Sequence, residues 1–324
     1  MAHYLVTGGC GFIGSHLCEF LLQHGHKVRV LDNLSTGKKE NISCDQIELQ
    51  IGDITNAQDV KQAFIGIDGC FHLAAIASVQ KSNEEWLATH QTNLTGTIRI
   101  FEEATRQLKK TPILYVSSAA IYGDNTHLPL GEDCLPRPLT AYGADKLACE
   151  HHGRVASLVH HIPTIGFRLF NVYGTRQDPS SPYSGVISIF MDKIARQEPV
   201  IIYGDGHQTR DFVYVKDVVR YFAKAMQHLG QDQSPDHGVF NICRGEKISI
   251  QTLLETLSDI AGFHPKITYA DARPGDIKHS QGSYLKLLQK FSFKPETDLK
   301  DGLRETYSFF HQPHQKNSAL GYSR

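Results

Sequence analysis

The sequence predicts an α/β protein built around a doubly wound parallel sheet, with a smaller α/β domain in its C-terminal part. In the first half of the chain, short apolar runs alternate with longer segments of 3.6-residue apolar period, which is the pattern of βαβ units. Several of the short runs are apolar on both faces, as in strands that helices cover from both sides. The length of 324 residues also fits about two domains.

The predicted elements follow one another along the first half of the chain. Strands are expected over residues 4–6, 28–31, 47–51, 70–73, 113–116 and 164–169, and helices over 12–24, 57–64, 86–108 and 141–159. A stretch rich in proline and serine then predicts a loop over 174–184. We therefore expect a first domain over 1–170 and a second over 171–324, with the chain returning to the first domain around 211–243.

Composition excludes several classes of protein. The 33 basic and 34 acidic residues nearly cancel, so the electrostatic footprint of a nucleic-acid or membrane-surface protein is missing. No apolar run is long enough for a membrane span, and the first residues do not resemble a secretory signal. The seven cysteines are scattered without a C-x-x-C pair, which indicates reduced thiols and a cytoplasmic location.

The histidines do not indicate a metal site. The chain contains 18 of them but no His-Glu-x-x-His motif. His151 and His152 are adjacent, as are His160 and His161, and neighbours in a helix point to different faces. We therefore expect no bound metal.

A glycine cluster between the first strand and the first helix predicts a dinucleotide site. Gly8 allows a tight turn, Gly11 allows the backbone to approach a pyrophosphate, and Gly14 allows the helix to pack closely on the sheet. The free N–H groups at the helix N-terminus, where Phe12 and Ile13 lie, favour a negatively charged ligand.

An acidic residue at the end of the second strand specifies which dinucleotide is expected. Asp32 is placed to accept hydrogen bonds from an adenosine ribose, and its carboxylate repels a 2′-phosphate, which favours NAD over NADP. Asp53 follows the third strand and is in reach of the adenine amino group. By itself, Asp53 would more often be a helix N-cap.

Three further residues predict the chemistry. Tyr142 and Lys146 are four apart in a predicted helix, so the ammonium lies beside the phenol and favours its ionised form. Ser118 stands at the carboxyl end of a predicted strand, the edge at which open α/β sheets bind ligands. A phenol, an ammonium and a hydroxyl at one edge suit proton transfer at a substrate hydroxyl.

Taken together, these motifs resemble the extended short-chain dehydrogenase/reductase superfamily, and within it the nucleotide-sugar 4-epimerases that act on UDP-glucose and UDP-N-acetylglucosamine. The resemblance extends over essentially the whole chain. It implies an NAD-binding Rossmann domain over 1–170 and a nucleotide-sugar-binding domain over 171–324. It also implies cofactor contacts from Gly8, Gly11, Phe12, Ile13, Gly14, Asp32, Asn33, Asp53, Ile54, Leu73, Ala74, Ala75, Asn93, Tyr142 and Lys146.

The resemblance assigns the substrate contacts as well. Ser118 would bind the sugar O4, Tyr142 would be the acid and base, and Lys146 would bind the nicotinamide ribose. Asn171, Arg210 and Arg273 would contact the diphosphate, Asp276 the uridine ribose, and Tyr203 the uracil. The implied sugar pocket consists of small residues: Ala77, Ser78, Gly185 and Ser280.

The residues after the catalytic serine separate the possible reactions. Related dehydratases and decarboxylases carry acids at the positions of Ala119 and Ala120, and neither alanine can move a proton. The resemblance therefore implies C4 epimerisation through a transient 4-keto sugar. The small Ser280 and the absence of a lysine at Ala77 favour UDP-N-acetylglucosamine and UDP-N-acetylgalactosamine over UDP-glucose and UDP-galactose.

Three alternatives stay open at this point. A UDP-hexuronate 4-epimerase would need a cationic or hydroxyl group near sugar C6, which Arg176 or Ser184 would supply. A nucleotide-sugar 4-ketoreductase would exchange its cofactor freely. A dinucleotide-sensing scaffold would not need Tyr142 and Lys146. The predicted helices 86–108 and 141–159 have more apolar positions than one sheet face requires, and we expect them to pair in a homodimer.

Overall fold

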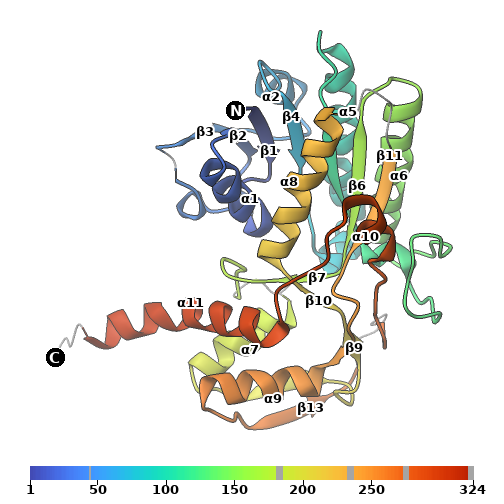
Figure 1. The fold of residues 1–324 in the computed structure, drawn as a ribbon. Coiled ribbons are helices and arrows are strands. Elements are labelled where there is room, and N and C mark those ends of the chain that lie inside the picture. The colour runs from blue at the N-terminus through green and yellow to red at the C-terminus, as the bar shows by residue number, and fades with distance from the viewer. Residues whose placement is uncertain (44, 180–184, 232–236, 273–276, 320–324) are drawn as a thin grey trace.

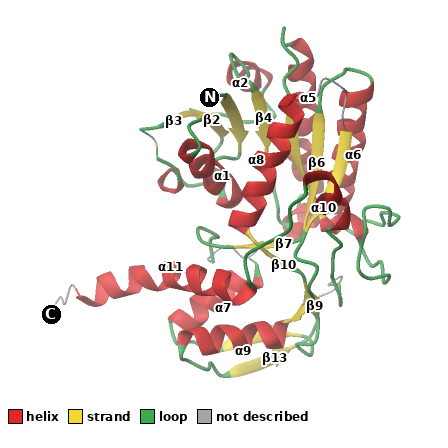
Figure 2. Ribbon diagram, in the orientation of Figure 1, coloured by secondary structure: helices red, strands yellow, loops and turns green. Residues whose placement is uncertain are grey.

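A computed structural model of the chain describes residues 1–43, 45–179, 185–231, 237–272 and 277–319. Its centre is a seven-stranded parallel sheet of order β11-β6-β5-β4-β1-β2-β3 (Figures 1 and 2). This order reverses direction between β1 and β4, as in a doubly wound sheet, and it confirms the predicted fold class. The strands are β1 (His3–Thr7), β2 (Lys27–Asp32), β3 (Ile47–Ile51), β4 (Gly69–His72), β5 (Ile113–Ser118), β6 (Thr164–Leu169) and β11 (His237–Ile242).

Helices cover both faces of this sheet, which explains why its strands are apolar on both sides. Leu5 and Val6 of β1 enter two different buried clusters, and so do Cys70 and Phe71 of β4. One cluster is completed by α1 (Phe12–Gln23), α8 (Val215–Gln231) and α10 (Leu285–Phe291). The other is completed by α2 (Ala57–Ala63), α5 (Gly96–Arg106) and α6 (Ala141–Leu158).

The predicted helix over residues 86–108 is interrupted by a wider turn. It begins as α4 (Trp86–His90), continues through a π-helical turn η2 (Gln91–Thr95), and ends as α5. A short helix before it, α3 (Val79–Glu84), is absent from the sequence prediction because its polar residues carry no helical apolar period. Both differences lie close to the candidate site described below.

The second body, in the lower part of Figure 1, is a set of helices around short strands with a separate buried cluster. Phe190, Ile202 and Leu253 are among its fully buried residues. Its elements are α7 (Val186–Ala195), β8 (Val200–Tyr203), β9 (Thr209–Arg210), β12 (Ile248–Ser249), α9 (Ile250–Ala261), β13 (Ile267–Ala270) and α11 (Leu299–Ala319). The remaining elements are η1 (Lys39–Asn41), η3 (Ala119–Tyr122), β7 (Asn171–Tyr173) and β10 (Phe212–Tyr214).

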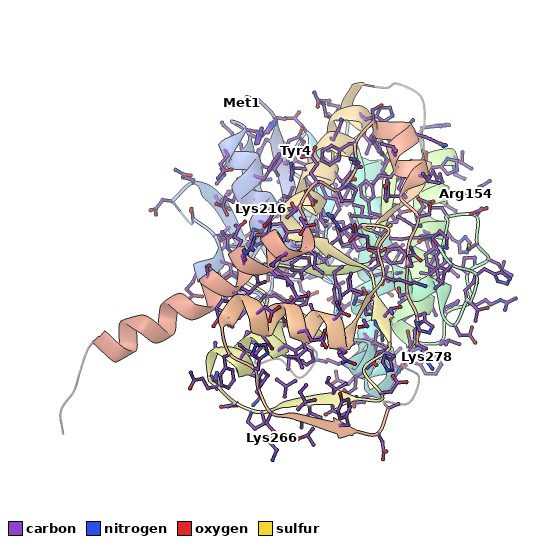
Figure 3. All side chains as sticks on the ribbon, turned by 60° about the horizontal axis from the view of Figure 1, so that its bottom comes forward. Met1, Tyr4, Arg154, Lys216, Lys266 and Lys278 are labelled. Atoms are coloured by element: carbon purple, nitrogen blue, oxygen red, sulfur yellow. The ribbon has the colours of Figure 1, made fainter. Side chains whose placement is uncertain are left out.

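The chain passes between the two bodies more than once. β7 and β10 pair with each other at the junction, and β11 pairs with β6 at the edge of the main sheet (Figure 1). At the start of α8, Lys216 (labelled in Figure 3) forms an ion pair with Glu305 of α11. The domain limits themselves stay a prediction. Among the described helices, none is both long and apolar enough to cross a membrane.

Candidate active site

The glycine turn after β1 has the close contacts that the sequence predicts. Gly8 has φ +71°, and a Cβ there would stand 2.8 Å from the backbone nitrogen of Ala74. A Cβ on Gly14 would stand 2.1 Å from the carbonyl oxygen of Gly8. A Cβ on Gly11 would meet only that same oxygen, at 3.2 Å, so this position is the more open of the three. α1 begins at Phe12 and Ile13 directly after the turn, with no acidic residue in its first turn.

Asp32 connects the end of β2 to this turn. Its side chain is buried, and its two carboxylate oxygens accept the N–H groups of Cys10 and Leu34 at 2.9 and 2.8 Å. Each carboxylate oxygen has a second lone pair, so Asp32 can still accept hydrogen bonds from a ribose. The carboxylate thus stands at the carboxyl end of the sheet, as the sequence predicts.

Asp53 and Asn33 face each other across the ends of β3 and β2. The amide of Asn33 donates to Asp53 at 2.8 Å, and Thr55 donates to the other oxygen through its N–H and its hydroxyl. Burial favours the neutral acid, but these hydrogen bonds outweigh it and lower the pKa of Asp53. The N-cap of α2 is Asn56, so Asp53 does not play the alternative role considered above. Ile54 is buried in the core, so its side chain packs against other apolar residues.

A buried chain of hydrogen bonds lies behind the site, and sequence reasoning missed it. The hydroxyl of Thr7 meets one ring nitrogen of His72 at 2.8 Å, and the hydroxyl of Thr97 meets the other at 2.9 Å. The N–H groups of Leu73 and Ala74 donate to the same Thr7 hydroxyl. Burial and the nearby Lys146 lower the pKa of His72 to about 3, so the ring is neutral. Its partners lie 65 and 25 residues away, and no local pattern reveals such a contact.

Asn93 supports the loop that follows β4. It lies in the π-helical turn η2, and its amide both accepts from the N–H of Ile76 and donates to the carbonyl of Ile76. Ala75 is half-buried in the same loop. The turn aims the Asn93 side chain at this loop, and π turns occur often at functional sites. The amide is fully buried, so Asn93 shapes the site through Ile76.

Ser118 ends β5 and points away from its neighbour Ser117. The Ser118 hydroxyl oxygen accepts the N–H of Ala120 at 3.1 Å, which leaves its own proton free for a ligand. Ser117 instead enters the protein interior and donates to Glu150. The turn after Ser118 lies directly against α6, since a Cβ on Gly143 would stand 2.7 Å from the carbonyl oxygen of Ala120.

α6 carries Tyr142 and Lys146 into the same region. Thr140 caps the helix by accepting the N–H of Gly143, and the N–H of Tyr142 donates to Ser82 of α3 at 3.2 Å. The Nζ of Lys146 lies 5.8 Å from the centroid of the Tyr142 ring and donates to the carbonyl of Val116 at 2.8 Å. Both side chains are largely buried. The structure thus brings together the ends of β5 and α6, which hold the predicted catalytic residues.

On the second body, three predicted substrate contacts lie around the junction. The N–H of Asn171 donates to the carbonyl of Asp211, the residue after Arg210. The N–H of Ser280 donates to the carbonyl of Thr209, the residue before Arg210. Backbone hydrogen bonds therefore join Asn171 and Ser280 to the two residues that flank Arg210.

The other predicted contacts are spread more widely. Ser78 caps α3 through the N–H of Lys81, and Ala77 before it is exposed. Gly185 is the N-cap of α7, and Tyr203 ends β8 and is 38% exposed. Arg273 and Asp276 lie outside the described residues.

These features fit a bound dinucleotide. The Gly8–Gly14 turn is a cradle that side chains would fill, and buried Asp32 stands beside it at the carboxyl end of the sheet. Within the residues that the structure describes, no three His, Cys, Asp or Glu side chains are grouped to hold a metal ion. The cofactor residues are consistent with NAD.

Comparison with known proteins identifies the family. The model of the NAD dependent epimerase/dehydratase family matches residues 4–243. The UDP-glucose 4-epimerase of Mycolicibacterium smegmatis is 31% identical, over 96% of this chain and 99% of that protein. The UDP-N-acetylglucosamine 4-epimerase structure from Methanobrevibacter ruminantium, in complex with UDP-N-acetylmuramic acid, has 36% identity and TM-score 0.90, over 96% of this chain and 99% of that one.

The UDP-glucose 4-epimerase structure from Thermotoga maritima, with UDP-glucose, has 34% identity and TM-score 0.91, again over 96% of this chain and 99% of that one. The resemblance drawn from the motifs is therefore confirmed, and so is the prediction of an NAD-dependent enzyme. This chain belongs to the NAD dependent epimerase/dehydratase family.

Proposed function

We propose that this enzyme inverts the configuration at C4 of a UDP-hexose, with UDP-N-acetylglucosamine and UDP-N-acetylgalactosamine as its preferred pair. The observation that carries the proposal is the arrangement of Ser118, Tyr142 and Lys146 at the carboxyl end of the sheet, beside a turn that begins with two alanines. Relatives that act on UDP-glucose and UDP-N-acetylglucosamine support the substrate class.

Tyr142 and Ser118 both act on the sugar O4. Tyr142 takes the proton of the sugar O4 and returns it later, and Ser118 donates a hydrogen bond to the same oxygen. The ammonium of Lys146 lies 5.8 Å from the centroid of the Tyr142 ring and places a positive charge beside the group that exchanges the proton. When bound, NAD supplies the hydride acceptor and donor at C4. Gly8, Gly14 and Asp32 would hold the dinucleotide.

The turn after Ser118 explains why elimination is not expected. Removal of water from the sugar would need a second acid and base, and Ala119 and Ala120 offer neither. The 4-keto sugar must also turn its other face toward the cofactor, which requires space. Ala77, Ser280 and Gly185 are small enough to leave it.

Substrate choice rests on the same small residues. Ser280 leaves room for an N-acetyl group at sugar C2, although one such group changes discrimination in a pocket by only about 1–3 kcal/mol. UDP-glucose is therefore expected to be a slower substrate rather than an excluded one.

We also propose a homodimer through the predicted helices 86–108 and 141–159, which the structure forms as α4 to α5 and as α6. Trp86 and Leu87 of α4 are 68% and 71% exposed, and Val155 of α6 is 45% exposed. Exposed large apolar side chains on helices that pack together are typical of a protein interface. Light scattering after size-exclusion chromatography tests this, and a monomer mass at micromolar concentration contradicts it.

One assay tests the main proposal. Purified protein, with no added cofactor, is incubated separately with UDP-N-acetylglucosamine, UDP-glucose and UDP-glucuronate, and the anomeric protons of product are followed by NMR. We expect the fastest conversion with UDP-N-acetylglucosamine. Fastest conversion of UDP-glucuronate would indicate a hexuronate epimerase. Turnover that requires added NADPH would indicate a ketoreductase, and UDP-sugar binding with no turnover a sensor.

A further inference from the structure

We propose that Asp211 is a positioning residue that holds the diphosphate and sugar contacts of the second body in place through its ionised carboxylate. This inference rests on the proposed function. Asp211 lies between β9 and β10 and is completely buried. It does not line the site itself, and none of the sequence motifs assigns it a role.

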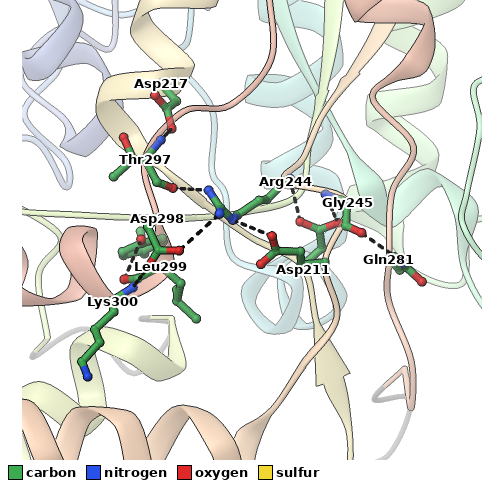
Figure 4. A network of polar contacts seen from close by, with 11 residues as sticks. Asp211, Asp217, Arg244, Gly245, Gln281, Thr297, Asp298, Leu299 and Lys300 are labelled. Carbon is green, nitrogen blue, oxygen red and sulfur yellow. Dashed lines mark hydrogen bonds and ion pairs between the residues drawn. The ribbon is translucent and has the colours of Figure 1, made fainter.

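Three backbone N–H groups converge on the Asp211 carboxylate. Arg244 donates to one oxygen at 2.8 Å, and Gly245 and Gly282 donate to the other, each at 3.0 Å. The close view in Figure 4 shows Asp211 beside Arg244 and Gly245. The side-chain amide of Gln281 donates a hydrogen bond to the carbonyl of Gly245. One side chain thus ties two separate loops to the β9–β10 junction.

The guanidinium of Arg244 is directed elsewhere. It donates to the carbonyl of Thr297 and pairs with Asp298 and Glu246. The negative charge of Asp211 is therefore held mainly by peptide dipoles. A carboxylate suits this position because it has only acceptors, whereas an asparagine would present an NH₂ group to one of the three N–H groups.

Two of the three segments that meet at Asp211 carry a predicted substrate contact, and the third, Arg244–Gly245, carries none. Arg210 precedes Asp211 in the chain, and the carbonyl of Asp211 accepts the N–H of Asn171. Gly282 lies two residues after Ser280, whose N–H donates to Thr209. Arg210 is thus the chain neighbour of Asp211, and Ser280 lies on the loop that the carboxylate holds through Gly282. Asn171, far away in sequence, is bonded to the main chain of Asp211.

The protonation state of Asp211 adds a second observable. Burial raises the pKa of Asp211 to about 7. The nearby Glu246 also raises it, whereas the three N–H donors lower it. Cys243 is a further titratable neighbour, Arg210 precedes Asp211 in the chain, and Arg244 contacts the carboxylate through its backbone N–H. When the carboxyl takes up a proton, its O–H competes with the N–H donors and the loops lose part of their anchor.

Asp211→Asn is the main test, and Asp217→Asn is its matched control. Asp217 is also fully buried and accepts a backbone N–H, from Thr297 at 3.0 Å, but it holds the far end of the same network (Figure 4). We expect Asp211→Asn to raise KM for the UDP-sugar about tenfold or more, with kcat and bound NAD within about threefold of the wild type. We expect Asp217→Asn to lower the melting temperature while KM stays unchanged.

The results separate the two proposals. If the wild type converts no UDP-sugar, the proposed function fails. If the wild type is active and Asp211→Asn retains the wild-type KM, Asp211 is structural only and the inference is wrong. Should Asp211→Asn not fold, the wild-type KM for UDP-N-acetylglucosamine is measured from pH 8 to pH 6 instead, since its diphosphate does not titrate there. A KM that rises below pH about 7 supports the inference, and one that stays flat contradicts it.

Discussion

The hydroxyl of Ser117 donates to the carboxylate of Glu150 at 2.6 Å, and both residues are buried. Ser117 is the neighbour of Ser118 on β5, and Glu150 follows Lys146 by one helical turn on α6. The bond therefore fixes the strand that ends in Ser118 against the helix that carries Tyr142 and Lys146. The Glu150 carboxylate also accepts two hydrogen bonds from Arg168, one from its Nε at 2.9 Å and one from a terminal nitrogen at 2.8 Å.

Glu150→Gln is expected to be strongly destabilising. It leaves the buried Arg168 without its counter-charge, and breaking one partner of a buried pair costs about 3–5 kcal/mol. The free energy of unfolding in urea measures this loss. Glu103→Gln is the matched control, because Glu103 is equally buried but its partner Arg106 is 55% exposed. If the free energy of unfolding of Glu150→Gln falls by less than about 1 kcal/mol, another group neutralises the charge of Arg168.

Tyr142→Phe is expected to reduce kcat by about 10²–10⁴ while NAD and UDP-sugar still bind. The substitution removes the hydroxyl that we propose moves the O4 proton, and it leaves the ring in place beside Lys146. Single-turnover and steady-state rates measure the effect, and the absorbance of bound cofactor reports on binding. Tyr269→Phe, at an exposed position of β13, serves as the control and should behave as the wild type. Full activity in Tyr142→Phe would rule out this residue as acid and base.

Gly8→Ala is expected to abolish NAD binding. The new Cβ would stand 2.8 Å from a backbone atom of Ala74, at a residue with φ +71°, so the turn must move. Gly25→Ala is a matched control, since Gly25 has φ +76° but nothing within 4 Å of the added Cβ. Both variants carry the backbone strain of about 1 kcal/mol, and only the first disturbs the turn. Cofactor content after purification distinguishes them, and equal content in the two variants contradicts the assignment.

Local spacing made part of this site predictable from the sequence, and long-range contacts made the rest unpredictable. The glycine turn, Asp32, Ser118 and the Tyr142–Lys146 pair follow from positions within one element or one turn. Asp211 and its partner Gly282 are 71 residues apart, and their contact depends on how two loops meet. Periodicity also failed at α3, where Ser82 is buried by its contact with α6 rather than by an apolar stripe.

His16 is expected to reduce stability at acid pH. Burial lowers its pKa to about 4, so the folded protein keeps the ring neutral where the unfolded chain takes up a proton. Stability is therefore complete above the unfolded pKa of 6.5 and is lost as the pH falls toward 4. Between pH 7.5 and pH 5 this amounts to about 2 kcal/mol.

The comparison is made between the wild type and His16→Gln, because other groups titrate over the same range. Asp211 acts in the opposite direction, since a raised pKa removes stability as the pH rises toward 7. Gln takes up no proton, so the variant should lose about 2 kcal/mol less than the wild type from pH 7.5 to pH 5 in urea unfolding. Parallel losses in the two proteins would show that His16 is already charged in the folded state.

Ser280→Tyr is expected to change the substrate preference. Ser280 is half-buried and is held by the bond from its N–H to Thr209, so its side chain is replaceable without loss of that bond. A tyrosine would occupy the room proposed for the N-acetyl group. We expect kcat/KM for UDP-N-acetylglucosamine to fall about 10–200-fold relative to that for UDP-glucose. Ser280→Ala, which keeps the space, is the control and should retain the wild-type ratio. If the tyrosine variant also keeps that ratio, the sugar C2 lies elsewhere, and the preference for N-acetylated sugars loses its structural basis.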